Sequence, residues 1–155
     1  VRELEEIRSE LAESGYLKTP RSKKKMSASL PPLHFVSDDG YDIYVGRNNR
    51  QNDELTLHIA AKNDIWLHTK AVHGSHTVIS SNGGEGPPET VLQAANLAAY
   101  YSKARSSGSV AVDFCPVRNV KKPSGARPGM VIYNVYETVY VTPDEALVNR
   151  IKADK

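Results

Sequence analysis

The sequence has few of the residues that stabilise a fold covalently or through a metal. It contains one cysteine, Cys115, in 155 residues, which excludes an internal disulfide and a cysteine-built zinc site and indicates a reducing compartment. No apolar run approaches the roughly 20 residues of a membrane helix, so we expect no membrane insertion. Trp66 is the single tryptophan. A hydrophobic fraction of 39% is enough for one core and predicts one domain with modest extensions.

A net charge of +2 hides a marked segregation of charge along the chain. Acidic residues gather in residues 1–17, at Glu3, Glu5, Glu6, Glu10 and Glu13. Residues 18–32 carry cations and no acid, at Lys18, Arg21, Lys23, Lys24 and Lys25. A second basic stretch, residues 100–128, holds Lys103, Arg105, Arg118, Lys121, Lys122 and Arg127 against one acid. Two basic blocks on a nearly neutral chain indicate a surface that faces a polyanion.

Three regions follow from this pattern. In residues 1–17, Leu4, Ile7 and Leu11 have the spacing of a coiled-coil seam, so we interpret this region as the end of a helical arm. The alternative is an amphipathic helix packed on the domain. Residues 18–32 are predicted to be a basic flexible linker, and residues 33–155 a globular domain. Because the chain starts on Val1 inside a helical pattern, we expect it to be part of a longer protein.

The pattern in residues 33–155 predicts an α+β fold, with a mixed, mainly antiparallel sheet and helices packed on it. A hairpin turns at Asp39-Gly40. Asn52 is expected to cap a helix that buries Leu55, Ile59 and Ala60, and Pro88 or Glu89 opens an alanine-rich helix with basic residues in its last turn. SVAVDFCPV (109–117) predicts a core strand, MVIYNVYETVYVT (130–142) a closing hairpin, and the residues after Pro143 a last helix.

The segment KNDIWLHTKAVHGSH, residues 62–76, has the density of an active site. A histidine-held metal would need His68, His73 and His76 to meet, with Asp64 as a further ligand. Strand alternation places Asp64, Trp66 and His68 on one face and separates His73 and His76 from them, so convergence on one ion is not expected. The chain shows no nucleophile elbow and no phosphate-binding loop. We therefore expect no catalytic residue, metal or cofactor.

The trio on one strand face, Asp64, Trp66 and His68, suggests a binding role instead. An exposed aromatic ring stacks on a nucleobase while flanking polar groups bond base edges or ribose. The alternative is structural, with Trp66 filling the core and Asp64 capping a turn. Further polar and basic side chains complete the composition typical of an RNA-binding surface: Arg47, Asn48, Asn49, Gln51, Lys103, Arg105, Lys121 and Lys122.

The order and spacing of GRNNRQND, DIWLH, GSH, AAYYSKAR and VKKPSGARPGMVIY resemble the NFACT-R domain of the NFACT family, over about residues 33–145. The preceding helix and linker resemble the end of that family's coiled-coil arm. In one departure, His73 stands before the GSH element where bacterial members often have proline.

The resemblance implies a cytoplasmic, ribosome-associated role in ribosome quality control. It implies binding to tRNA and to a stalled large ribosomal subunit with peptidyl-tRNA, and recruitment of alanyl-tRNA for C-terminal alanine tailing. It also implies that Asp64, Trp66 and His68 engage tRNA. The family's other name, fibronectin-binding protein, implies the alternative of a surface adhesin.

Overall fold

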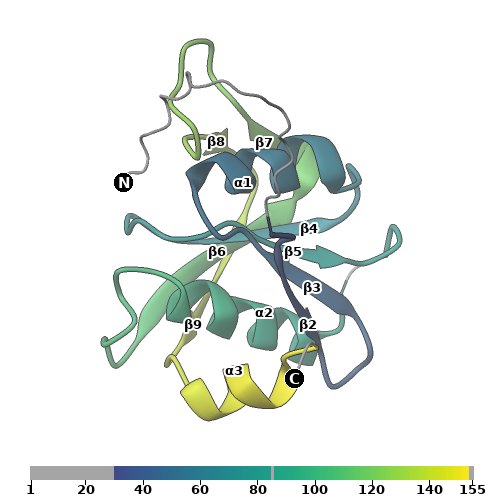
Figure 1. Ribbon diagram of the computed structural model, residues 1–155, viewed down its shortest axis with the longest axis vertical. Helices are drawn as coiled ribbons and strands as arrows, with labels where there is room; N and C mark the ends of the chain where they lie inside the picture. Colours follow the sequence, from purple (N-terminus) through teal and green to yellow (C-terminus); the bar gives the residue numbers. More distant parts are fainter. Residues whose placement is uncertain (1–29, 85, 154–155) are drawn as a thin grey trace, which may run out of the picture. The chain divides into compact units, whose positions relative to one another are not determined.

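A six-stranded antiparallel sheet in the order β2-β3-β5-β4-β6-β9 forms the centre of the fold (Figure 1). This computed structural model describes residues 30–84 and 86–153, so the expected helical arm, 1–17, and nearly all of the linker, 18–32, lie outside the described residues. The strands are β2 (Leu33–Val36), β3 (Asp42–Val45), β4 (Ile65–Thr69), β5 (Thr77–Ser80), β6 (Val110–Pro116) and β9 (Glu137–Val141). The architecture confirms the α+β prediction.

The first two strands form the expected hairpin. β2 pairs with β3 from Leu33↔Val45 to Val36↔Asp42, and the Gly40 N–H donates to the Ser37 carbonyl across the turn, 2.9 Å. Gly40 has a φ of +90°, a backbone conformation that glycine adopts without steric cost. The Asp-Gly pair therefore fixes the register with which the sheet begins.

Two helices, α2 (Pro88–Tyr100) and α3 (Glu145–Ile151), cover one face of the sheet (Figure 1). The buried alanines of α2 let its backbone approach the strands closely, above the large side chains Phe35, Ile43, Leu67 and Ile79. Pro88 occupies the first turn of α2 as expected, where its missing N–H costs no hydrogen bond. This face holds the larger of the two cores.

A second layer covers the opposite face (Figure 1). It consists of α1 (Asn49–Asp53), the π-helical turns of η1 (Glu54–Ile59), the short 3₁₀ helix η2 (Val117–Asn119) and the ribbon of β7 (Val120–Lys121) with β8 (Ile132–Tyr133). Its core contains Leu55, Trp66, Val78, Cys115, Val117 and Val120. Because the central strands are covered on both faces, they carry apolar side chains on both sides.

The helix after β3 differs from the prediction at both ends. Asn48, not Asn52, is the N-cap, and Asn52 is buried. In η1 the Ala60 N–H bonds to the Leu55 carbonyl, five residues back, which is the π-helical pattern. The wider turn places Ala60 under Leu55 and rotates Ile59 outward, so the expectation of a buried Ile59 is wrong: it is 57% exposed.

Two other local predictions are also wrong. The expected closing hairpin over 130–142 does not form, because β8 pairs with β7 and β9 pairs with β6. Helix α2 ends at Tyr100, so Lys103 and Arg105 lie in the turns that follow rather than in its last turn.

Among the helices of the described residues, none is long and apolar enough to cross a membrane.

The π-helical register predicts opposite outcomes for two aliphatic residues of η1. Leu55→Ala should lower the free energy of unfolding by roughly 2–5 kcal/mol, because it leaves a cavity in the second core. Ile59→Ala should change it by no more than about 0.5 kcal/mol, because Ile59 faces solvent. Urea unfolding followed by circular dichroism measures both. Equal losses would indicate a regular α-helical register that buries both side chains.

Candidate nucleic-acid interface

Trp66 lies at the centre of the second core and has no exposed surface. Its ring stacks parallel to His68, with centroids 5.7 Å apart, and packs against Tyr133 at 4.7 Å. The expectation of an exposed ring that stacks on a base is therefore wrong for this structure, and the structural alternative is right. The second layer, which the sequence did not place over this strand, covers the ring.

Asp64 is also buried, immediately before β4. Its two carboxylate oxygens accept the backbone N–H groups of Ala61, 2.9 Å, and Ser81, 3.1 Å. One side chain thus fixes the turn before β4 to the loop after β5. Both oxygens are used inside the fold, so Asp64 acts as the turn cap that was the alternative to a base contact.

His68 shares the strand face of Trp66, as alternation predicts. Its Nδ1 lies 2.7 Å from the Thr69 carbonyl oxygen and its Nε2 3.2 Å from the Gly74 carbonyl oxygen. Burial lowers the pKa of His68, while the two carbonyls act in the opposite direction. A neutral ring donates only one hydrogen bond, so His68 donates at any one time either to the Thr69 carbonyl, at the end of its own strand, or to the Gly74 carbonyl in the following turn.

His76 joins this cluster, contrary to the expected separation. Its ring contacts Trp66 edge-on at 5.4 Å and His68 at 5.6 Å. Burial lowers the pKa of His76 to about 4, so the ring is neutral at pH 7. The contacts then assign the tautomer: Nε2–H donates to the Gly129 carbonyl, 3.1 Å, and Nδ1 accepts from the Thr56 hydroxyl, 2.8 Å. His73 is exposed.

The polar residues around α1 are largely occupied by the backbone. The Asn48 side-chain oxygen accepts from the Gln51 N–H, 2.8 Å, and the Gln51 side-chain oxygen accepts from the Arg47 N–H, 2.7 Å. This reciprocal arrangement satisfies donors at the start of the helix. Asn49 lies against Gly129, where an added Cβ would come within 2.9 Å of the Asn49 Oδ1. Arg47, Asn48 and Asn49 are nevertheless exposed.

The cations that follow α2 are held in a defined turn. The Lys103 N–H donates to the His73 carbonyl, 2.9 Å, and the Ser75 N–H to the Tyr101 carbonyl, 3.1 Å. Arg105 lies over the Tyr100 ring, 4.0 Å from its centroid, and its Nε donates to the Tyr100 carbonyl, 2.7 Å. Lys103 and Arg105 are exposed, so the turn presents two cations on a fixed backbone.

Arg47 acts electrostatically on the same turn. Burial raises the pKa of Tyr101, and the nearby Arg105 and Arg47 guanidiniums act against that rise. The structure therefore brings together three predicted residues, Arg47, Lys103 and Arg105, from two distant parts of the chain. We call this group the cationic patch.

The two lysines of the 120–130 loop behave differently from each other. Lys122 forms an ion pair with Asp53, 3.1 Å, and donates to the Arg127 and Met130 carbonyls. The same carboxylate accepts the Gly129 N–H, 3.0 Å. Lys122 thus holds the loop against α1 and is committed to the fold. Lys121 is exposed on β7.

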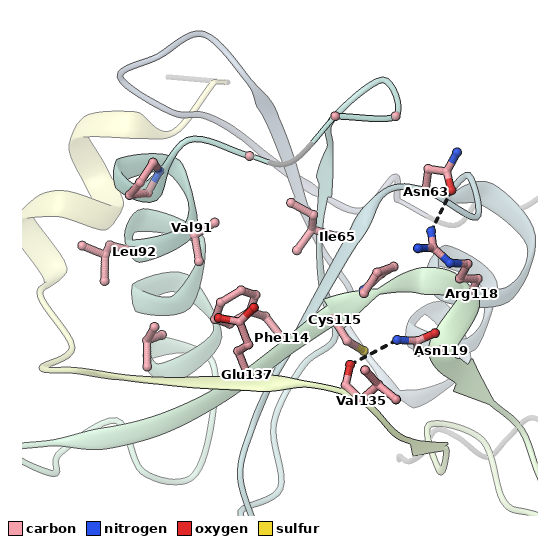
Figure 2. A pocket seen from close by; sticks show the side chains of 16 residues that line it. Asn63, Ile65, Val91, Leu92, Phe114, Cys115, Arg118, Asn119, Val135 and Glu137 are labelled. Atoms are coloured by element: carbon pink, nitrogen blue, oxygen red, sulfur yellow. Dashed lines mark hydrogen bonds between the residues drawn. The ribbon is translucent and has the colours of Figure 1, made fainter.

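A groove of about 830 Å³ opens at the Ile65 end of β4, beside the start of α2 (Figure 2). Apolar side chains of Ile65, Leu92 and Phe114 line it, and Arg118 bonds to Asn63 at one end, 2.8 Å. None of the predicted RNA-binding residues lines it. Burial raises the pKa of its Cys115 to about 11, so the thiol stays protonated at neutral pH and is not an activated nucleophile.

Sequence reasoning missed a polar cluster beside His68. Lys70 pairs with the buried Asp113, 3.3 Å, and lies over the Tyr136 ring, 4.6 Å from its centroid. Asp113 also accepts from the Tyr133 hydroxyl, 2.6 Å, and from the Thr138 hydroxyl, 2.7 Å. The alternation in NVYETVYV, with tyrosines four residues apart, was the available signal for an aromatic strand face.

Comparison with known proteins gives consistent matches. Residues 32–134 match the family described as "NFACT protein RNA binding domain". The chain is 49% identical over 154 residues to the Rqc2 homolog RqcH of Bacillus subtilis (strain 168), a match that covers 97% of this chain and 27% of that protein. It is 44% identical over 151 residues to the Rqc2 homolog RqcH of Streptococcus suis (strain 05ZYH33), with the same two coverages.

A solved structure, that of the C-terminal part of the fibronectin/fibrinogen-binding protein from Streptococcus suis, superposes with a TM-score of 0.81 at 44% identity. The match covers 97% of this chain and 60% of that chain. The chain thus spans about a quarter of the length of the curated relatives that it matches. These findings confirm the family resemblance drawn from the sequence motifs.

Burial of Trp66 predicts that the residue stabilises the domain and is inaccessible to solutes. Trp66→Ala should lower the free energy of unfolding by roughly 3–5 kcal/mol, the usual loss for a large aromatic side chain in a core. Because Trp66 is the single tryptophan, its fluorescence reports on this site alone. In the native protein iodide should quench this fluorescence weakly, and strongly after unfolding in urea. Equal quenching in both states would contradict the burial.

The lowered pKa of His76 predicts a loss of stability in mild acid. Because the unfolded chain binds this proton near the ordinary pKa of 6.5 and the folded domain only near 4, protonation favours unfolding. The contribution of the neutral His76 ring to the free energy of unfolding is complete above about pH 6.5 and declines as the pH falls towards 4. Unfolding free energy should be about 2 kcal/mol lower at pH 5 than at pH 7.

Urea titrations at the two pH values measure this difference. The matched control is His76→Gln, which removes the titrating ring. This variant should be less stable than the wild type at pH 7, and its stability should keep only the smaller pH dependence that arises from His68. A wild-type stability that does not change between pH 7 and pH 5 would contradict the assignment of a neutral His76.

Proposed function

Because this chain belongs to the family of NFACT protein RNA binding domains, we propose that it is the RNA-binding module of a ribosome quality control factor. The module binds tRNA and the RNA of a stalled large ribosomal subunit that still carries peptidyl-tRNA. The longer protein recruits alanyl-tRNA there, and the nascent chain grows a C-terminal alanine tail. The module itself binds RNA and catalyses no step, and it works in the cytoplasm on the ribosome.

The observation that carries this proposal is the cationic patch. Arg47 is near enough to Tyr101 to act against the rise of its pKa. The Lys103 backbone is bonded to the 73–75 segment, so Lys103 and Arg105 present their charge from a fixed turn. Phosphate contacts by lysine and arginine supply most of the sequence-independent affinity for nucleic acids. The name of a further relative supports the ribosomal context: the ribosome quality control complex subunit NEMF homolog of Drosophila melanogaster, 35% identical over 72 residues.

The predicted site residues divide into two groups in this proposal. Asp64, Trp66, His68 and Lys122 build the support from inside the fold, and they act on RNA through the surfaces that they hold in place. Asn48, Asn49 and Gln51 follow Arg47 at the start of α1, and Lys121 lies on β7; in this proposal they contribute polar and electrostatic contacts to the RNA.

A second function follows from the name of one solved relative, a fibronectin/fibrinogen-binding protein. In this alternative the domain belongs to a cell-surface adhesin and recognises fibronectin. The two functions differ in how they depend on salt and on the cationic patch, because counterion release is specific to a polyanion such as RNA. A competition between tRNA and fibronectin for the same protein separates them.

The cationic patch predicts a charge-dependent affinity for tRNA. Replacing Lys103 and Arg105 together with alanine should weaken binding and lower the slope of log affinity against log salt by roughly 0.7–0.9 for each phosphate that the variant no longer neutralises. The control is Lys62→Ala, which removes an exposed cation on the turn before β4, away from the patch. Fluorescence anisotropy with labelled tRNA at several salt concentrations measures both quantities.

Three outcomes would contradict the proposal. The wild-type domain could fail to bind tRNA, its affinity could be independent of salt, or Lys62→Ala could weaken binding as much as the double variant. Displacement of tRNA by fibronectin, with an affinity for fibronectin that the double variant retains, would favour the adhesin.

A further inference from the structure

We infer that the open sheet face at Tyr136 and Tyr140, with Lys70, is a stacking platform for unpaired RNA bases. This inference rests on the proposed RNA-binding function and names the part of the RNA that a second surface recognises. It assigns to two tyrosines the role that the sequence suggested for Trp66, which is buried.

The two tyrosines lie on the uncovered part of the sheet. β9 is an edge strand, and alternation along it places Tyr136, Thr138 and Tyr140 on one side. Thr138 donates to Asp113, which fixes that side as the face of Trp66 and His68. The second layer covers Trp66, but it leaves Tyr136 44% exposed and Tyr140 71% exposed.

The neighbours of Tyr140 leave its ring open. Its partner in the ladder is Ala111, whose side chain is too small to cover a ring. The Lys70 N–H donates to the Ala111 carbonyl, 2.9 Å, so Lys70 is next in the same row. Lys70, Ala111 and Tyr140 therefore run across three strands with a cation at one end and a ring at the other.

The chemistry of this face fits a nucleotide. Aromatic side chains on an exposed sheet stack on bases of any sequence, and a nearby cation meets the phosphate. The Lys70 ammonium lies over the Tyr136 ring, donates to the Tyr136 hydroxyl, 3.2 Å, and pairs with the buried Asp113. Its side chain is still 40% exposed, so it adds positive charge to this face from a fixed position. Tyr136 and Tyr140 are about 13 Å apart along an extended strand. Lys70 covers one face of the Tyr136 ring, so Tyr140, which is 71% exposed, is the more open of the two.

The same face is a poor match to a protein partner. Stable protein interfaces need a continuous apolar centre, whereas Thr138 between the two rings is hydrogen-bonded to Asp113 and Ala111, opposite Tyr140, is small. The platform also adjoins the cationic patch through one turn, because Lys70 begins the segment whose His73 holds the Lys103 backbone. One RNA strand that leaves the patch would therefore meet the rings.

The test compares two RNA probes of equal charge with the 155-residue chain. One probe is a hairpin with an unpaired loop, and the other is a fully paired duplex. Tyr140→Ala should weaken hairpin binding about tenfold and leave duplex binding and its salt slope unchanged. Tyr140→Phe keeps the ring and should bind both probes within about twofold of wild type. Val135→Ala, at a residue that is 82% exposed off this face, is the surface control.

The remaining outcomes overturn the inference in distinguishable ways. If the wild type binds both probes and Tyr140→Ala binds both equally well, the platform is wrong and the proposed function stands. An equal loss on both probes would show that Tyr140 does not read unpaired bases. A change in oligomeric state without a change in RNA affinity would make the face a protein interface. If the wild type binds neither probe, the proposed function fails as well.

Discussion

The neutral ring of His76 is the contact on which the second layer depends. It donates to Gly129 in the 120–130 loop and accepts from Thr56 in η1, while its edge packs on Trp66. Its backbone N–H donates to the buried Asn52 side chain, 3.1 Å. One residue at the start of β5 therefore ties a helix, a loop and the sheet together. A charged ring would lose the Nδ1 acceptor, so the arrangement requires the pKa that burial lowers.

Around that ring, polar side chains make a rigid support out of segments that would otherwise be loops. Asp53 accepts the Gly129 N–H and pairs with Lys122, so a loop rich in proline and glycine is fixed at both of its ends. Asp64 does the same for the turns beside β4 and β5. The dense run of histidines, tryptophan and aspartate in 62–76 is thus explained by architecture. In the proposed function, RNA contacts are made by the exposed cations and rings that this architecture holds in place.

The sequence predicted the features that local chemistry decides, such as the Asp39-Gly40 turn and the helix that opens at Pro88. The closing hairpin was wrong because strand pairing is a long-range choice, in which β9 pairs with β6 and β8 with β7. Alternation correctly placed Trp66 on the face of His68, but periodicity does not reveal whether a further layer covers that face. That layer also uses the polar groups of the α1 segment, because a helix start needs acceptors for its free N–H groups.

The 69–75 turn links the two surfaces that face solvent, and its backbone leaves little freedom to either. Ala71 has a φ of 59°, which costs energy for a residue with a Cβ. The Thr69 hydroxyl donates to the Val72 carbonyl, 2.8 Å, and an added Cβ at Gly74 would come within 2.8 Å of Ser102. Lys70 lies in this turn, and the Lys103 N–H donates to the His73 carbonyl in the same turn. The Nε2 of His68 lies 3.2 Å from the Gly74 carbonyl oxygen, so this ring joins the sheet to the backbone segment that carries Lys70 and contacts Lys103.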